Sequence, residues 1–284
     1  MTTRTVPYPL VRAAARAAKP AVRRMWRRTV LRRATDETAS AAVRSAVVVA
    51  PHPDDETLGC GALIARKRAA GADVDVVIVT DGRHSHRSAL ISPDELAEIR
   101  AREGRAACDR LGVDARRVHL LGYHEADLDA HFEPLVERLG HLIETARPDD
   151  VFTTCGADWH VDHQAVNKAT QRAVQERSLP CRLLEYPIWW WVDGPWVEHG
   201  RAEPRRAWQF LSELVQGSLV EAVKVETGPF RDAKRGALRE YRSQTTRLTG
   251  EATWAIMDDN LLALFLGTSE PFLVPQTSVE HGAP

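Results

Sequence analysis

The sequence predicts an α/β fold, a Rossmann-like three-layer sandwich around a mostly parallel sheet. Short runs rich in valine alternate along the chain with segments of helical periodicity, which is the pattern of successive βαβ units. The first run, residues 45–50 (SAVVVA), shows no alternation of polar and apolar residues, as expected for a strand buried on both faces of a sheet. Sites in such sheets lie at the carboxyl ends of the strands, so the loops that follow the strands are the places to look for chemistry.

Local sequence signals indicate where the predicted helices and strands begin and end. The helical segment that begins near residue 56 stops at Gly71, and the one that begins near residue 93 stops at Gly112, because glycine readily adopts the left-handed conformation that ends a helix. Residues 188–284 carry weaker signals. The predicted strands are 45–50, 74–80, 118–121, 150–154, 182–187 and 221–225, and the predicted helices are 56–70, 93–111, 131–146, 162–177 and 230–241.

Composition points to one substantial core. The chain has 284 residues, of which 44 % are hydrophobic, and its four cysteines form no CxxC pair. This usage predicts neither a disulfide framework nor a thiolate zinc site, and we expect a protein of the reducing cytoplasm. The longest apolar runs are too short to span a bilayer.

The charge is unevenly distributed. Residues 1–33 contain ten Lys and Arg and no acid, whereas the remainder carries 28 basic and 39 acidic residues, a net charge of −11. We therefore divide the chain into a basic arm, residues 1–40, helical or mobile, and a main domain, residues 41–284. The arm could pack on the acidic body or make weak contact with an anionic membrane, which would make the protein peripheral to it. No nucleic-acid partner is expected. Because every chemical motif lies after residue 45, we expect the arm to be dispensable for chemistry.

Two loops contain the residues of a metal site. The loop after the first strand, residues 51–57 (PHPDDET), places one imidazole and three carboxylates within five residues. The loop after the fourth strand, residues 158–163 (DWHVDH), adds two histidines. Each loop alone could be a solvated charged turn. Together, at one edge of one sheet, they suit zinc, which binds imidazole and carboxylate ligands and leaves a position for water when the protein supplies three.

The stretch 47–61, VVVAPHPDDETLGCG, together with HVDH at residues 160–163, resembles the LmbE/PIG-L family of zinc-dependent N-deacetylases. The resemblance spans residues 45–187 and also touches the helix near Arg100 and Glu103 and the YRSQ segment that starts at Tyr241. It implies a hydrolase that removes an N-acetyl or related acyl group from an amino sugar or glycoconjugate through a metal-activated water. An amidase acting on a thiol or other small-molecule conjugate and a noncatalytic binding domain remain as alternatives.

The resemblance also implies roles for individual residues. His52, Asp55 and His163 would hold one zinc ion, with ferrous iron as the alternative metal in the cell. Asp54 would be the general base that accepts a proton from the water. His160 would stabilise the oxyanion and protonate the leaving amine. Asp162 would be a further catalytic residue, and it would orient His160.

The substrate side departs from the family. Many members carry Pro-Asp-Gly after the third strand, where this chain has residues 124–126 (HEA), so the acid remains as Glu125 but the turn glycine is replaced. We expect substrate contacts from Glu125, from Asp81 and Arg83 after the second strand, and from Trp159. The run of three tryptophans at 189–191 suits either a sugar-binding wall or the core. The sequence names neither the substrate nor the oligomeric state.

Overall fold

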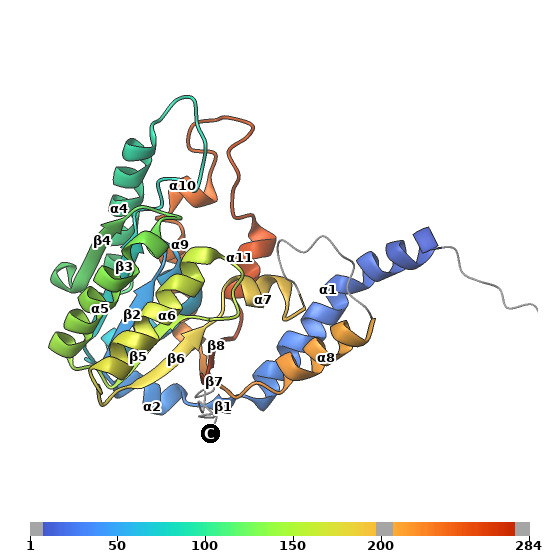
Figure 1. The fold of residues 1–284 in the computed structure, drawn as a ribbon, viewed down its shortest axis with the longest axis horizontal. Coiled ribbons are helices and arrows are strands. Elements are labelled where there is room, and N and C mark those ends of the chain that lie inside the picture. The colour runs from blue at the N-terminus through green and yellow to red at the C-terminus, as the bar shows by residue number, and fades with distance from the viewer. Residues whose placement is uncertain (1–7, 197–206, 276–284) are drawn as a thin grey trace, which may run out of the picture.

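The computed structural model describes residues 8–196 and 207–275, which form one eight-stranded sheet covered by helices on both faces (Figure 1). The strand order is β1-β7-β8-β6-β5-β2-β3-β4. Every pairing is parallel except those of β8, which runs antiparallel to β6 and β7. The strands are β1 (Thr35–Asp36), β2 (Ala46–Ala50), β3 (Val74–Thr80), β4 (Val118–Tyr123), β5 (Asp150–Thr154), β6 (Arg182–Tyr186), β7 (Ala222–Glu226) and β8 (Ser269–Leu273). The predicted fold class is confirmed.

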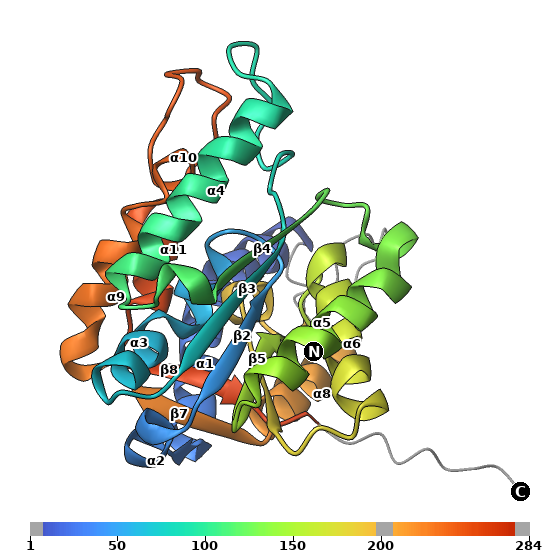
Figure 2. The same cartoon turned by 90° about the vertical axis from the view of Figure 1, so that its left-hand side faces the viewer.

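Successive side chains of a strand point to opposite sides of the sheet, and helices cover both sides, so the valine runs are buried on both faces. Val48 of β2 belongs to one hydrophobic cluster and Val47 and Val49 to the other. Helices α3, α4 and α9 cover the first face, and α5 and α6 cover the second (Figure 2). The α-helices are α1 (Tyr8–Arg33), α2 (Thr38–Val43), α3 (Asp55–Ala69), α4 (Pro93–Arg110), α5 (Phe132–Ala146), α6 (Val161–Glu176), α7 (Trp189–Asp193), α8 (Ala207–Ser218), α9 (Arg231–Leu238), α10 (Arg242–Thr245) and α11 (Asp259–Phe265).

Strand β8 has no counterpart among the predicted strands. Its sequence, SEPFL, contains serine, glutamate and proline, which rarely mark a central strand. The structure buries Glu270 because Lys234 of α9 neutralises it at 2.7 Å, and the glutamate accepts hydrogen bonds from the backbone of Ala62 and Leu63. Since those two residues belong to α3, this ion pair also holds the helix that begins at Asp55.

Helix α1 is part of the core. Trp26 is 1 % exposed and its ring lies 4.6, 5.5 and 5.8 Å from the rings of Trp190, Trp191 and Trp196. Its indole N–H donates to the carbonyl of Gly217 at 3.1 Å. Helix α1 therefore packs on the body, which was one of the two alternatives for the arm, and removing it would expose a cage of indole rings. That the arm is dispensable for chemistry stays a prediction.

No helix within residues 8–196 or 207–275 combines the length and the apolarity that crossing a membrane requires.

Candidate catalytic site

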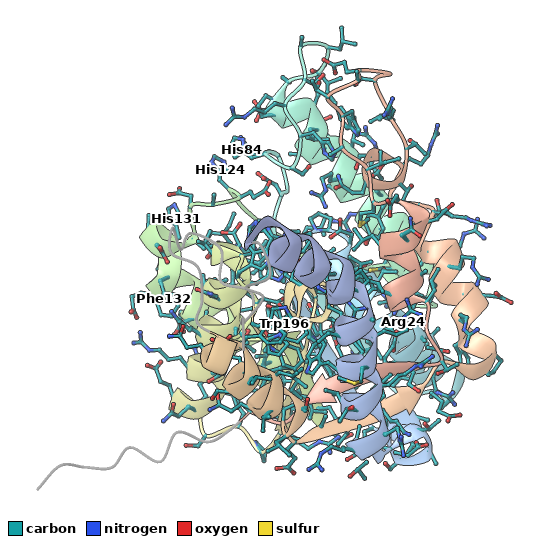
Figure 3. The ribbon with its side chains drawn as sticks, turned by 90° about the vertical axis from the view of Figure 1, so that its right-hand side faces the viewer. Arg24, His84, His124, His131, Phe132 and Trp196 are labelled. Atoms are coloured by element: carbon teal, nitrogen blue, oxygen red, sulfur yellow. The ribbon has the colours of Figure 1, made fainter. Side chains whose placement is uncertain are left out.

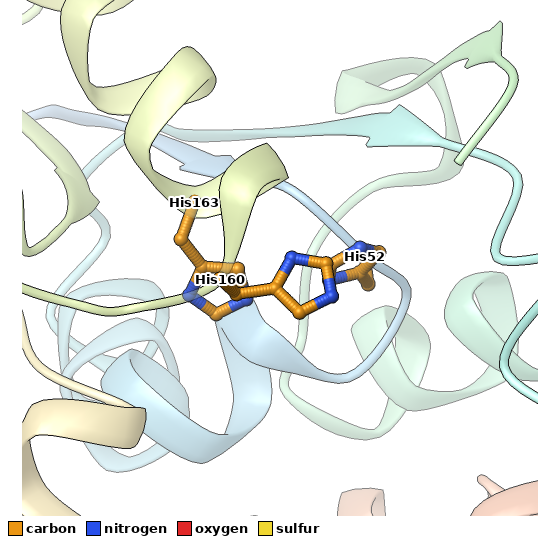
Figure 4. A group of neighbouring side chains, drawn as sticks. All are labelled: His52, His160 and His163. Atoms are coloured by element: carbon orange, nitrogen blue, oxygen red, sulfur yellow. The ribbon is translucent and has the colours of Figure 1, made fainter. Parts of the chain in front are cut away.

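The two motif loops meet because their strands are neighbours. β2 pairs with β5 in parallel register, so their carboxyl ends lie at the same edge of the sheet. His52 follows β2, while His160 caps the amino end of α6 and His163 lies in the first turn of that helix. The three rings face one another (Figure 4), with ligand nitrogen atoms all within 4.8 Å. Side chains that are more than a hundred residues apart in the sequence thus form one cluster.

Asp55 links two of these rings. Its Oδ2 lies 3.2 Å from Nδ1 of His52 and 3.3 Å from Nε2 of His163, and all three residues are buried. Burial opposes charge on both rings, but hydrogen bonds with Asp162 and Asp55 raise the pKa of His52 to about 9. Against the same burial, the charges and hydrogen bonds of Asp55 and Asp158 raise the pKa of His163 to about 10. The cluster thus attracts positive charge, and a metal ion would displace these protons.

The donors fit a metal ion. Three imidazoles, those of His52, His160 and His163, are close enough to share one, and a second overlapping set combines His52 and His160 with Glu125 and Asp162. Nitrogen and carboxylate oxygen are the ligands of catalytic zinc. The structure therefore contains a His/Asp group suited to a metal.

Asp158 is a buried carboxylate to which the sequence analysis assigned no role. Its Oδ2 lies 2.8 Å from Nδ1 of His163, and it accepts hydrogen bonds from the backbone of Ile188 and Trp190. It thus leaves Nε2 of His163 facing Asp55. An acid five residues before a histidine is a weak signal in a sequence, and only the turn before α6 shows that the two meet.

We expect Asp158→Asn to weaken zinc binding by about 10–100-fold, the effect of losing a carboxylate that orients a ligand histidine. The measurement is competition with a chromophoric chelator. Asp109→Asn, on the exposed surface of α4, is the matched control and should bind zinc as the unmodified protein does. Equal affinities for the two variants would show that His163 needs no such partner.

Asp54 lies beside the cluster and not within it. Its backbone φ is 133°, a strained value for a residue with a side chain, and its Oδ2 lies 2.9 Å from a guanidinium nitrogen of Arg100. That arginine also donates to the carbonyls of Pro53 and Gly82, which fixes the loop. Burial raises the pKa of Asp54 to about 8, although the charge of Arg100 opposes the shift. The carboxyl group can therefore exchange a proton near neutral pH.

Asp162 contacts His52 through its side chain and His160 through its backbone. Its carboxylate lies 3.1 Å from Nε2 of His52 and accepts the backbone N–H of Ala126. Its contact with His160 is made by its own backbone N–H, which lies 3.3 Å from Nδ1 of that ring. Ala126 stands where many family members have the turn glycine, and it retains a left-handed φ of 64°. The hydrogen bond to Asp162 helps to hold this alanine in a conformation that favours glycine.

The cluster opens into a cavity of about 450 Å³. Its lining includes polar side chains, among them Arg100 and Gln244. It also includes apolar side chains, because α7 contributes Trp189 and Val192 and α11 contributes Phe265. Such a mixed lining is typical of a small-molecule site.

Two of the four predicted substrate residues line this cavity. Trp159 and Glu125 do, and Glu125 lies 3.8 Å from Nε2 of His52. Asp81 and Arg83 do not, because they form an ion pair with each other at 2.7 Å and Arg83 also pairs with Asp94 at 2.9 Å.

Several lining residues were missed or left open by the sequence. The cavity wall after β3 consists instead of His84, Ser85 and His86, whose sequence is that of an ordinary polar loop. The tryptophan run divides: Trp189 lines the cavity, whereas Trp190 and Trp191 pack on Trp26.

Comparison with known proteins adds independent findings. Residues 47–174 match the family model described as PIG-L: GlcNAc-PI de-N-acetylase. A 1D-myo-inositol 2-acetamido-2-deoxy-alpha-D-glucopyranoside deacetylase of Mycobacteroides abscessus is 28 % identical over 264 residues, which cover 81 % of this chain and 91 % of the relative. The uncharacterized deacetylase YaiS of Escherichia coli is 33 % identical over 152 residues, which cover 51 % of this chain and 75 % of the relative.

A solved structure supports the fold. The N,N'-diacetylchitobiose deacetylase of Pyrococcus horikoshii superimposes with a TM-score of 0.60 at 20 % identity, covering 95 % of this chain and 94 % of that one. At this identity the likeness shows the fold alone. The family match, the relatives and the loop motifs agree, and the chain belongs to the PIG-L (LmbE-like) family.

Proposed function

We propose that this protein is a metal-dependent N-deacetylase that hydrolyses the acetamide, or a related amide, of an amino sugar or glycoconjugate. The observation that carries the proposal is the buried cluster of His52, Asp55 and His163, which opens into a cavity beside Asp54 and His160. Its relatives support the substrate class. They include the deacetylase of M. abscessus already described and a diacetylchitobiose deacetylase of Thermococcus kodakarensis, both named for acetylated amino sugars.

We assign the metal to His52, Asp55 and His163. Two neutral imidazoles and one carboxylate would leave a divalent ion with net positive charge. When bound, zinc or ferrous iron would polarise the amide carbonyl and lower the pKa of water at the site. The placement of Asp55 between the two rings favours this set over the three-imidazole set.

The remaining residues move protons. Asp54 accepts the proton of the attacking water, and Arg100 holds its carboxylate in place at 2.9 Å. Burial and the nearby His52 and His163 charges lower the pKa of His160 to about 4, so its ring is neutral at rest. Because Nδ1 faces the backbone N–H of Asp162, the neutral ring carries its proton on Nε2. That N–H can stabilise the oxyanion, and the leaving amine takes the proton that Asp54 removed from the water.

The proposal is tested by amine release. The zinc-loaded protein is incubated with a panel of N-acetylated amino sugars, free and conjugated, and free amine is quantified before and after chelation. We expect release from at least one substrate, loss on chelation and recovery when zinc is restored. A fully metallated protein that releases amine from none of them would contradict the proposal.

His160→Ala should retain zinc and lower kcat by roughly 10²–10³-fold, the range for losing one oxyanion donor. The reason is that this ring is assigned to the reaction and not to the metal. Metal content and steady-state kinetics on the same sample are the measurements, with His141→Ala on the exposed surface of α5 as the control. Loss of zinc from His160→Ala would show that this ring is a metal ligand.

A further inference from the structure

We propose that helix α1 presents a cationic face to an anionic membrane surface and so docks the enzyme on acidic phospholipid. The proposal concerns location and does not rest on the assigned catalytic activity.

The face consists of Arg24, Arg28 and Arg32. These residues are spaced by four, so they project from the same side of the helix, and all three are exposed. None of them forms a hydrogen bond or ion pair within the described part of the chain. Together with Lys224 of β7 they line a groove of about 640 Å³, in which Glu226 is the one carboxylate among the described lining residues. Figure 3 shows Arg24 at the side of α1.

The other face of α1 fixes the helix to the body. Trp26 and Val30 are each 1 % exposed. Arg23 donates to the carbonyl of Asp193 at 2.8 Å, and Arg27 donates to the carbonyl of Trp191 at 2.6 Å. The arginines of α1 whose side chains are described thus fall into two sets: Arg23 and Arg27 are hydrogen-bonded to the body, and the exposed ones are not.

The body does not neutralise this face. The chain after residue 33 carries a net charge of −11, yet no described carboxylate forms an ion pair with Arg24, Arg28 or Arg32, and Glu226 is the one that shares their groove. An external polyanion would complement them.

The neighbouring side chains favour lipid over nucleic acid. Met25 is 56 % exposed beside Arg24, and an apolar side chain among cations suits the boundary between headgroups and acyl chains. Nucleic-acid surfaces instead interleave cations with exposed aromatic rings on which bases stack. The aromatic side chain within this stretch, Trp26, is buried.

Docking through α1 would also bring the cavity close to the bilayer. α1 contacts α7 through the Trp26 cage, and α7 contributes Trp189 and Val192 to the cavity wall. Only α1 itself and the short helix α7 thus connect the cationic face to the cavity.

The test is cosedimentation of the full-length protein with vesicles of phosphatidylcholine alone or mixed with phosphatidylglycerol, at low and high salt. We expect binding to the mixed vesicles only, with release at high salt. The triple variant Arg24→Gln, Arg28→Gln, Arg32→Gln should partition on the order of 100-fold more weakly, since each basic residue near an anionic surface contributes about five-fold. The matched control removes three arginines from α4: Arg102→Gln, Arg105→Gln and Arg110→Gln. It should bind as the unmodified protein does.

Three results would overturn the proposal. The first is absence of binding to the anionic vesicles at low salt. The second is an equal loss in the α4 control, which would make binding a matter of net charge. The third is binding to a single-stranded RNA oligomer without binding to vesicles, which would make this face a nucleic-acid surface. If the triple variant melts early, the three single variants, each expected to weaken binding about five-fold, provide the same comparison.

Discussion

Asp54→Asn should leave the protein loaded with metal and lower kcat by roughly 10²–10⁴-fold, whereas Asp55→Asn should empty the metal site. The two residues are chemically identical neighbours, and the structure separates them. Asp55 shares one oxygen between His52 and His163 at 3.2 and 3.3 Å. The asparagine variant offers a weak neutral ligand there. Asp54 contacts Arg100 instead, and its amide replacement keeps an oxygen for that hydrogen bond while removing the proton acceptor.

Metal analysis and steady-state kinetics on the same preparations decide between these roles. His163→Ala is the positive control for metal loss and should behave as Asp55→Asn does. Asp94→Asn, an exposed acid of α4, is the neutral control. A metal-free Asp54→Asn beside a fully loaded Asp55→Asn would reverse the two assignments.

Trp26→Ala should lower the free energy of unfolding by about 3–5 kcal/mol, the usual cost of emptying a buried aromatic site. Its ring is enclosed by Trp190, Trp191 and Trp196. The substitution also removes the N–H that donates to the carbonyl of Gly217. Urea unfolding followed by circular dichroism measures the change.

The adjacent Met25→Ala is the matched control, because Met25 is 56 % exposed and its truncation should change stability by no more than about 0.5 kcal/mol. If both variants unfold at the same urea concentration, α1 does not contribute to the core. A protein that begins at Thr35 should be less stable still, since it also lacks Val30, which is 1 % exposed.

The sequence alone determined the central sheet and the metal-binding motif. The signals are local: they are the valine runs at 46–50 and 74–80 and the glycines that end α3 and α4. Because each acts within a few residues, it predicts the same element whatever the rest of the fold. The two motif loops could be placed together because adjacent parallel strands end at one edge. That inference depends only on a topological regularity of α/β sheets.

Tertiary structure decided what depends on contact between distant segments. β8 forms from a poor strand sequence because Lys234 neutralises its buried Glu270. Trp26 is part of the core only because α7 and α8 pack beside it, and local periodicity, which can indicate a helix here, does not identify these partners. Likewise Asp158 and Asp162 acquire their partners from the turn of the loop at α6 and not from their spacing. Local patterns report the preferences of the backbone and of one face of an element, whereas burial of a charge or a large ring depends on which neighbour packs against it.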